Sequence, residues 1–222
     1  HPRDDVLSLE DMRGKPIMIA DASINAFWVW LRAEYEFSDR QIRKYTFNNA
    51  PFLVDEKAIQ QGYVTSEPYT IETRGGFKPQ VFLLSDYGYP SYAAMVLARN
   101  DWIEDRPEHV QAFVNATIEG WRSYVYGDPA PANRLILATN PDMTTEIIEQ
   151  AIEQMRRRAM LQSPDTQNRG IGTMTRERWQ QFFDTMSAHG VYAPTLDWRQ
   201  AFTTRFVNQT QVSQPASAPA NR

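Results

Sequence analysis

The sequence of 222 residues predicts an α/β fold. In the first ninety residues, short β-rich runs alternate with helical patterns, as in the strand–helix–strand units of parallel sheets. From residue 92 onward the pattern is almost entirely helical. With 42% hydrophobic and 23% charged residues, the chain has the composition of a globular protein with a sizeable core.

The predicted elements of the first ninety residues begin with a strand over 16–20, a short apolar run between Gly14-Lys15 and the polar Asp21. Apolar residues then recur at spacings of three and four up to Tyr35, which predicts a helix capped by Ser23. By the same reasoning, β-rich runs and apolar spacing predict further strands and one more helix. These are strands over 41–47, 63–66 and 80–84 and a helix over 52–61.

The second half predicts one strand, over 92–98, and three long helices over 107–125, 144–161 and 176–189. Each helix carries an apolar stripe, and we place Trp121 in the core together with Trp28 of the first half. A large apolar side chain left in water forgoes roughly 1.5 to 3 kcal/mol of burial energy. Because one strand offers little surface for three stripes, we expect strands of this half to be missing and the chain, which starts at His1, to be a fragment.

Charge and residue usage exclude several classes of protein. Lys and Arg number 23 against 27 Asp and Glu, for a net charge of −4, whereas nucleic-acid binders usually carry a basic excess. The lack of cysteine excludes disulfides, thiolate zinc sites and cysteine nucleophiles. Because the three histidines lie far apart, we expect no metal, no cofactor and no catalytic triad. The sequence also lacks an apolar run of the roughly 18 residues that a membrane span needs, so we expect no span.

Five short motifs carry a family resemblance. They are residues 9–17, which contain Gly14-Lys15 before a strand, residues 58–64, Ser66-Glu67-Pro68-Tyr69, residues 105–113 and a closing segment over 179–203. In order and spacing they resemble the periplasmic substrate-binding proteins of ABC importers, in the branch that binds nitrate, taurine or sulfonate, and thiamine-pyrimidine precursors. The resemblance covers about residues 8–207.

The resemblance implies a two-lobed, periplasmic-binding-protein-like (type II) fold with one lobe nearly complete and the other mainly its C-terminal helices. We expect a lead-in segment over 1–11, an α/β lobe over 12–90, the helical part of the other lobe over 91–208 and a disordered tail over 209–222, which is rich in Gln, Ser, Ala and Pro. Family members carry further sequence ahead of the first motif, so the resemblance also implies a missing export signal.

The function that the resemblance implies is that of a non-catalytic receptor, periplasmic or otherwise extracytoplasmic and attached to the membrane. Such a receptor closes on a small organic molecule and delivers it to an ABC permease in the inner membrane. Two alternatives stay open, because fold likeness does not separate them: an enzyme of the pyrimidine-synthesis type and the ligand-sensing domain of a signalling receptor.

Candidate ligand-binding residues follow the first predicted strand. In two-lobed α/β binders the ligand lies at the carboxyl ends of strands and at helix N-termini. Asp21, Ser23 and Asn25 occupy such a turn, although Ser23 is equally suited to cap a helix and Asn25 to face solvent. Because Asp21 disfavours an anion, we expect a neutral or cationic ligand such as a pyrimidine.

The resemblance also places Glu67 and Tyr69 in the cleft, where Glu67 would bind an amino group and Tyr69 would stack on a ring. The alternative is that Glu67 merely begins a helix, whose dipole favours an acidic first turn. Tyr87 and Tyr89 lie in the expected crossing between the lobes, where they would either line the cleft or pack in the core.

Overall fold

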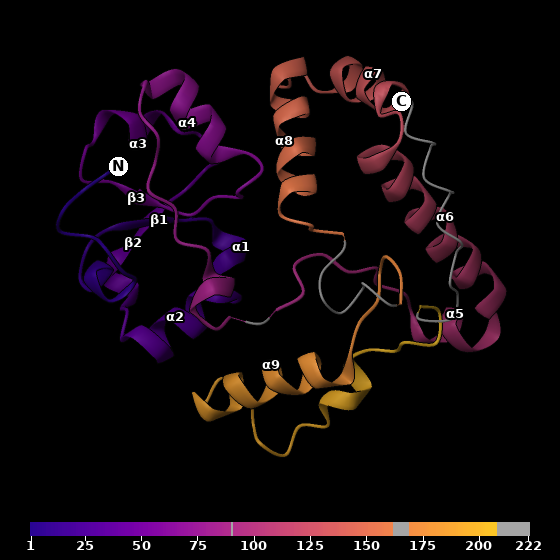
Figure 1. Ribbon diagram of the computed structural model, residues 1–222. Coiled ribbons are helices and arrows are strands. Elements are labelled where there is room, and N and C mark those ends of the chain that lie inside the picture. Colours follow the sequence, from indigo (N-terminus) through magenta and orange to yellow (C-terminus); the bar gives the residue numbers. More distant parts are fainter. Residues whose placement is uncertain (90, 162–168, 208–222) are drawn as a thin grey trace, which may run out of the picture.

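The computed structural model describes residues 1–89, 91–161 and 169–207, and it contains an α/β part over 1–89 and a helical part over 91–207 (Figure 1). The α/β part holds strands Ile17–Ile19 (β1), Ile42–Lys44 (β2) and Ile59–Gln60 (β3), and helices Asp21–Ile24 (α1), Phe27–Tyr35 (α2), Ala50–Val54 (α3) and Glu67–Gly75 (α4). The helical part holds Asn100–Asp105 (α5), Pro107–Tyr126 (α6), Ala130–Thr139 (α7), Thr145–Arg157 (α8) and Arg176–Ala188 (α9). Four 3-10 helices cover Glu10–Met12, Asp39–Gln41, Leu84–Tyr87 and Trp198–Ala201.

The sheet is parallel, with strand order β2-β1-β3. Ile17 is paired with Ile42 on one side and with Ile59 on the other. The central strand is the one predicted over 16–20, and its Ile17 and Ile19 are buried. Since the strands are parallel, their carboxyl ends meet at one edge of the sheet. At that edge β1 runs directly into α1, on the side of the α/β part that faces α8 (Figure 1).

The core of the α/β part is built on α2, whose Trp28 and Trp30 are fully buried. The indole N–H of Trp28 donates to the Asp39 carboxylate at 2.9 Å, so burial leaves this polar group satisfied. Helix α9 packs on the same core, because Met186 is buried in it and His189 pairs with Glu34 of α2 at 2.5 Å. The C-terminal region therefore returns to the first part of the chain.

Two predicted elements after β1 have different bounds in the structure. The helix predicted to follow Ser23 and to end at Tyr35 is broken at Asn25-Ala26 into α1 and α2, and Ser23 lies inside α1 rather than at its N-cap, which is Ala20. The helix predicted over 52–61 is also wrong beyond Val54, since residues 59 and 60 form β3. Pairing with Ile17 and Met18 gives Ile59 and Gln60 strand partners that outweigh their local helical pattern.

Three predicted strands do not form. The stretch 63–66 is not a strand, and neither are 80–84 and 92–98. Residues 80–83 lead into the 3-10 helix Leu84–Tyr87, and Phe82 packs against the core. In the stretch 92–98, Met95, Val96 and Leu97 are exposed. A strand forms only where a neighbouring strand pairs with its N–H and C=O groups. In the described ranges, no strand pairs with any of these three stretches.

The three long predicted helices correspond to α6, α8 and α9. Helix α6 buries Val110 and Val114 against Phe206, and α8 contacts α6, α7 and α4 of the α/β part. The prediction that Trp121 lies in the core is wrong, because its side chain is 44% exposed. The second face of α6 has no sheet to pack on in the described part of the chain. The tail predicted over 209–222 lies outside the described residues.

Candidate functional site

The three candidates after β1 lie at the carboxyl edge of the sheet. Asp21 opens α1 with its carboxylate exposed, Ser23 is half-buried within α1, and Asn25 ends that helix with its side chain exposed. Asp21 pairs with Lys44 at the end of β2, with 3.2 Å between Oδ2 and Nζ. Because Lys44 offsets the charge of Asp21, this edge presents both a carboxylate and an ammonium group.

A buried polar network lies beneath this edge. The Tyr45 hydroxyl, just after β2, is 3.0 Å from Glu67 Oε1 and 3.1 Å from Asn49 Oδ1. The Gln60 amide also donates to Asn49 Oδ1, at 2.9 Å. Burial, with the negative charge of Glu67 as a second cause, holds the pKa of the Tyr45 phenol well above its usual value. Tyr45 therefore keeps its proton and acts as a donor.

Glu67 is buried at the start of α4, with Pro68 in the first turn of the helix. The alternative that Glu67 begins a helix is thus confirmed. Its second carboxylate oxygen, Oε2, accepts the backbone N–H of Tyr63 at 2.7 Å, so both oxygens have partners within the chain. Direct contact of Glu67 with a ligand stays a prediction, as it does for Tyr69, which is half-buried in the same helix.

Tyr87 and Tyr89 pack against the core of the α/β part. The ring of Tyr89 lies 5.1 Å from that of Trp30 and 5.7 Å from that of Phe182 on α9. The backbone oxygen of Tyr87 lies 3.4 Å from the Tyr35 hydroxyl. These contacts match the core-packing alternative, and a cleft-lining role for either tyrosine stays a prediction.

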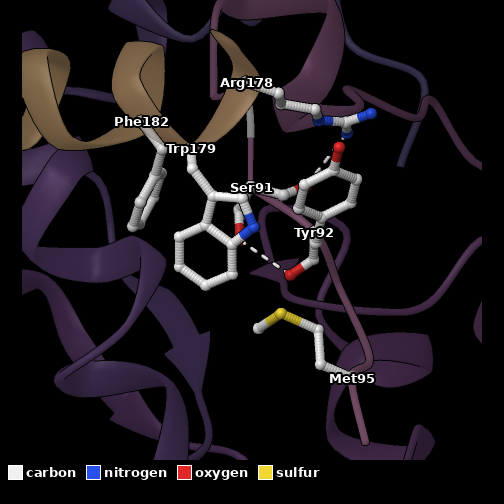
Figure 2. Close-up of a pocket in the computed structure, with 6 residues that line it drawn as sticks. All are labelled: Ser91, Tyr92, Met95, Arg178, Trp179 and Phe182. Carbon is white, nitrogen blue, oxygen red and sulfur yellow. Dashed lines mark hydrogen bonds between the residues drawn. The ribbon is translucent and has the colours of Figure 1, made fainter. Parts of the chain in front are cut away.

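A cavity of about 40 Å³ lies between the segment after residue 90 and α9, and Figure 2 shows the side chains that line it. The Arg178 guanidinium stacks 4.3 Å from the ring centre of Tyr92, and it donates to the Ser91 backbone oxygen at 3.2 Å (Figure 2). A cavity of this volume has room for water. The cavity is therefore part of the packing between α9 and the segment that begins at Ser91.

Two aromatic residues at the carboxyl edge escaped the sequence analysis. Phe47 and Tyr63 are 65% and 66% exposed, and each lies three residues beyond the end of its strand, β2 or β3. Strands predicted over 41–47 and 63–66 hid them, because both residues fell inside these ranges. Their sequence signal is their place beside turns, before Asn48-Asn49 and after Gly62.

A family model described as "NMT1/THI5 like" matches residues 1–132, more than half of the chain. The chain belongs to this family. The resemblance found in the sequence is thereby confirmed, and the parallel α/β sheet agrees with the periplasmic-binding-protein-like fold of the family. Within the described residues, none of the helices has both the length and the apolar character needed to cross a membrane.

One similar protein is the riboflavin-binding protein RibY of Chloroflexus aurantiacus, which is 25% identical over 213 residues. The alignment covers 90% of this chain and 58% of RibY, so the chain spans less than two thirds of the length of that relative. No solved structure matches the chain.

Proposed function

We propose that this protein is an extracytoplasmic receptor that binds a small organic molecule between two lobes and delivers it, unchanged, to an ABC permease. The observation that carries the proposal is the carboxyl edge of the sheet, which holds the polar residues Asp21, Lys44, Ser23 and Asn25 at the ends of β1 and β2. Carboxyl edges of parallel sheets are where α/β proteins bind ligands. Family membership and the name of RibY support the same reading.

The two lobes of the proposal are residues 12–90 and 91–208. Helices α4 and α8 lie in contact and belong to different lobes, and α9 of the second lobe packs on the core of the first. A receptor of this type converts ligand binding into a hinge movement that a permease recognises. The proposed location is the periplasm, or the outer face of a membrane to which the protein is attached.

The ligand of the proposal is a small organic molecule with polar edges. Asp21 would accept from an amino or hydroxyl group, Lys44 would donate to a carbonyl oxygen, and Ser23 and Asn25 are each able to do both. Two probes should be tried first. Riboflavin is chosen because RibY is named for it. An aminopyrimidine is chosen because the sequence motifs resemble those of proteins that bind pyrimidine precursors.

The histidines of the chain favour binding over catalysis. His1 stacks on Phe52 and on Phe77, His109 pairs with Glu108, and His189 pairs with Glu34. In the described residues, the partners of the three histidines do not include Asp21, Lys44, Ser23 or Asn25, so the proposal gives the histidines no acid–base role.

Titration of the purified chain with riboflavin and with the aminopyrimidine, followed by flavin fluorescence and by calorimetry, tests the proposal. Asn25→Ala should weaken binding by about 1 to 3 kcal/mol, the cost of one lost polar contact, with little change in melting temperature. Asn115→Ala, on the exposed surface of α6, is the matched control and should bind like the wild type. Equal affinity of Asn25→Ala and wild type would remove Asn25 from the site, and chemical conversion of the pyrimidine would favour the enzyme alternative.

A further inference from the structure

We propose that helix α9 moves with the α/β lobe, although it lies among the residues predicted for the other lobe, and that its N-terminal end, residues 175–179, is the pivot between the lobes. The inference rests on the receptor function proposed above, because a pivot has a role only if the lobes move. It deepens that function by naming the part of the chain about which they turn.

Helix α9 has its packing partners in the α/β part. Met186 is buried in the core of that part, and the ring of Phe182 lies 5.7 Å from that of Tyr89. At the C-terminal end of α9, His189 pairs with Glu34 of α2. The core cluster of α5 and α6, as far as the structure describes it, includes no residue of α9. Figure 1 accordingly shows α9 beside α2 and apart from α7 and α8.

The first connection between the two lobes begins after Tyr92, which α9 holds in place. The Tyr92 hydroxyl accepts the backbone N–H of Thr175 at 3.0 Å, and the Arg178 guanidinium lies 4.3 Å from the centre of the Tyr92 ring (Figure 2). Helix α5, on the far side of the connection, contacts α6. The chain therefore passes from one lobe to the other within residues 93–99.

The second connection precedes α9 and is only two residues long. Gly172 lies against α6, since a Cβ added there would be 3.6 Å from Cδ1 of Ile118. Three residues later, Thr175 is the N-cap of α9 and donates its N–H to Tyr92. The chain therefore crosses at residues 173–174.

The third connection follows α9. Phe202 stacks on Trp179, with 4.7 Å between the ring centres, and so stays with α9. Arg205 donates to the backbone oxygen of Ile103 on α5, at 3.2 Å. The chain therefore crosses again at residues 203–204.

All three connections begin at the same end of α9. Tyr92 and Phe202 each contact a residue of the stretch 175–179, and Thr175 begins that stretch. A lobe held by three connections that start side by side turns about the place where they start. The contact between α4 and α8 lies away from α9, so it is the contact that changes when the lobes turn (Figure 1).

Native-state hydrogen exchange of the 222-residue chain in increasing urea tests which lobe holds α9, and it needs no ligand. We expect the amides of α9 to open with the same urea dependence as those of β1, and the amides of α6 to open separately. Met186→Ala should speed exchange in β1 and α9 at least tenfold and leave α6 unchanged, whereas Val114→Ala should do the reverse. Amides of α9 that follow α6, or one common opening of all three elements, would overturn the assignment.

Pairs of spin labels measure the movement itself, because the chain has no cysteine of its own. Labels at Glu72→Cys on α4 and Gln181→Cys on α9 should give one narrow distance distribution, and labels at Glu72→Cys and Ala116→Cys on α6 a broader one. All three positions are exposed. Saturating riboflavin should shift the α4–α6 distance and leave the α4–α9 distance unchanged.

Arg178→Gln tests the pivot residue that holds Tyr92. Glutamine has no cation to stack on the Tyr92 ring, so the α4–α6 distribution of the free chain should widen while the α4–α9 distribution stays narrow. Arg176→Gln, at an exposed residue of the same helical turn, is the matched control and should leave both distributions unchanged. Equal widths in Arg178→Gln and wild type would overturn the role of Arg178.

The outcomes separate this inference from the receptor function. If neither riboflavin nor the aminopyrimidine binds, the receptor function fails, and hydrogen exchange still decides where α9 belongs. If riboflavin binds and shifts the α4–α9 distance, the receptor function stands and the pivot is wrong.

Discussion

Tyr45 is the residue whose chemistry makes the clearest prediction about stability. Its folded-state pKa is raised by burial and by Glu67, whereas the phenol of an unfolded chain titrates near its ordinary pKa of about 10. Above that pH the unfolded state binds fewer protons than the folded state, so stability is complete below about pH 10 and falls as pH rises further. Urea unfolding across this range should show a steeper alkaline loss for wild type than for Tyr45→Phe.

Tyr45→Phe should also lower the stability of the protein at neutral pH. Removing the hydroxyl takes the phenol donor from Glu67 Oε1, whereas Asn49 Oδ1 keeps the Gln60 amide as a donor, and the expected cost is about 1 to 3 kcal/mol of unfolding free energy. Tyr63→Phe is the control, because it removes a hydroxyl from an exposed side chain and should keep the wild-type pH profile. An identical alkaline slope in wild type and Tyr45→Phe would mean that the phenol ionises equally well in both states.

At the residue scale, the residues at the carboxyl edge of the sheet could be predicted from the sequence, but the contacts of their side chains could not. Asp21, Ser23 and Asn25 could be predicted because they follow an apolar run that is plainly a buried strand. The partnership of Asp21 with Lys44 could not, because it depends on which strand lies next to β1. The hydrogen bond between Glu67 and the Tyr45 hydroxyl could not be predicted either, because the two residues are 22 positions apart in the sequence.

At the scale of elements, helices were predicted better than strands. A helix satisfies its backbone internally and shows its buried face as a periodic stripe, so α6, α8 and α9 could be recognised from local sequence. A strand depends on partners that are distant in sequence. The stretch 92–98 has the composition of a strand and forms none, whereas Ile59-Gln60 forms β3 because β1 lies beside it.

Two tryptophans on different helices should contribute very differently to stability. Trp28 on α2 is fully buried and donates a hydrogen bond to Asp39, whereas Trp121 on α6 is 44% exposed. Trp28→Ala should therefore cost about 3 to 5 kcal/mol of unfolding free energy. Trp121→Ala should cost about 1 kcal/mol or less, as a partly exposed site does. Urea denaturation of both variants measures the difference, and equal losses would show that the outer face of α6 is covered in solution.

At the scale of the whole molecule, the apolar side chains of the α/β part are better buried than those of the helical part. The α/β part closes its core with α9, whereas the helical part leaves large apolar side chains on α6 and α7 in solvent. Among them are Phe113, Trp121 and Leu135, which is 68% exposed. An open groove between the two helices, lined by Trp121, Tyr124 and Ile136, continues this surface. We call the combined surface of α6 and α7 the apolar face.

The apolar face predicts that the 222-residue chain associates with itself as its concentration rises, because contiguous exposed apolar surface is stabilised by removal from water. Sedimentation velocity over a concentration series should show reversible growth that added salt does not weaken, as expected for apolar rather than ionic contacts. Replacing Phe113 and Leu135 together by Lys should keep the chain monomeric. Val54→Lys, at a residue that is 85% exposed on α3, is the control and should associate like the wild type. A wild-type chain that stays monomeric at every concentration would show that the side chains of α6 and α7 cover one another in solution more fully than their exposure indicates.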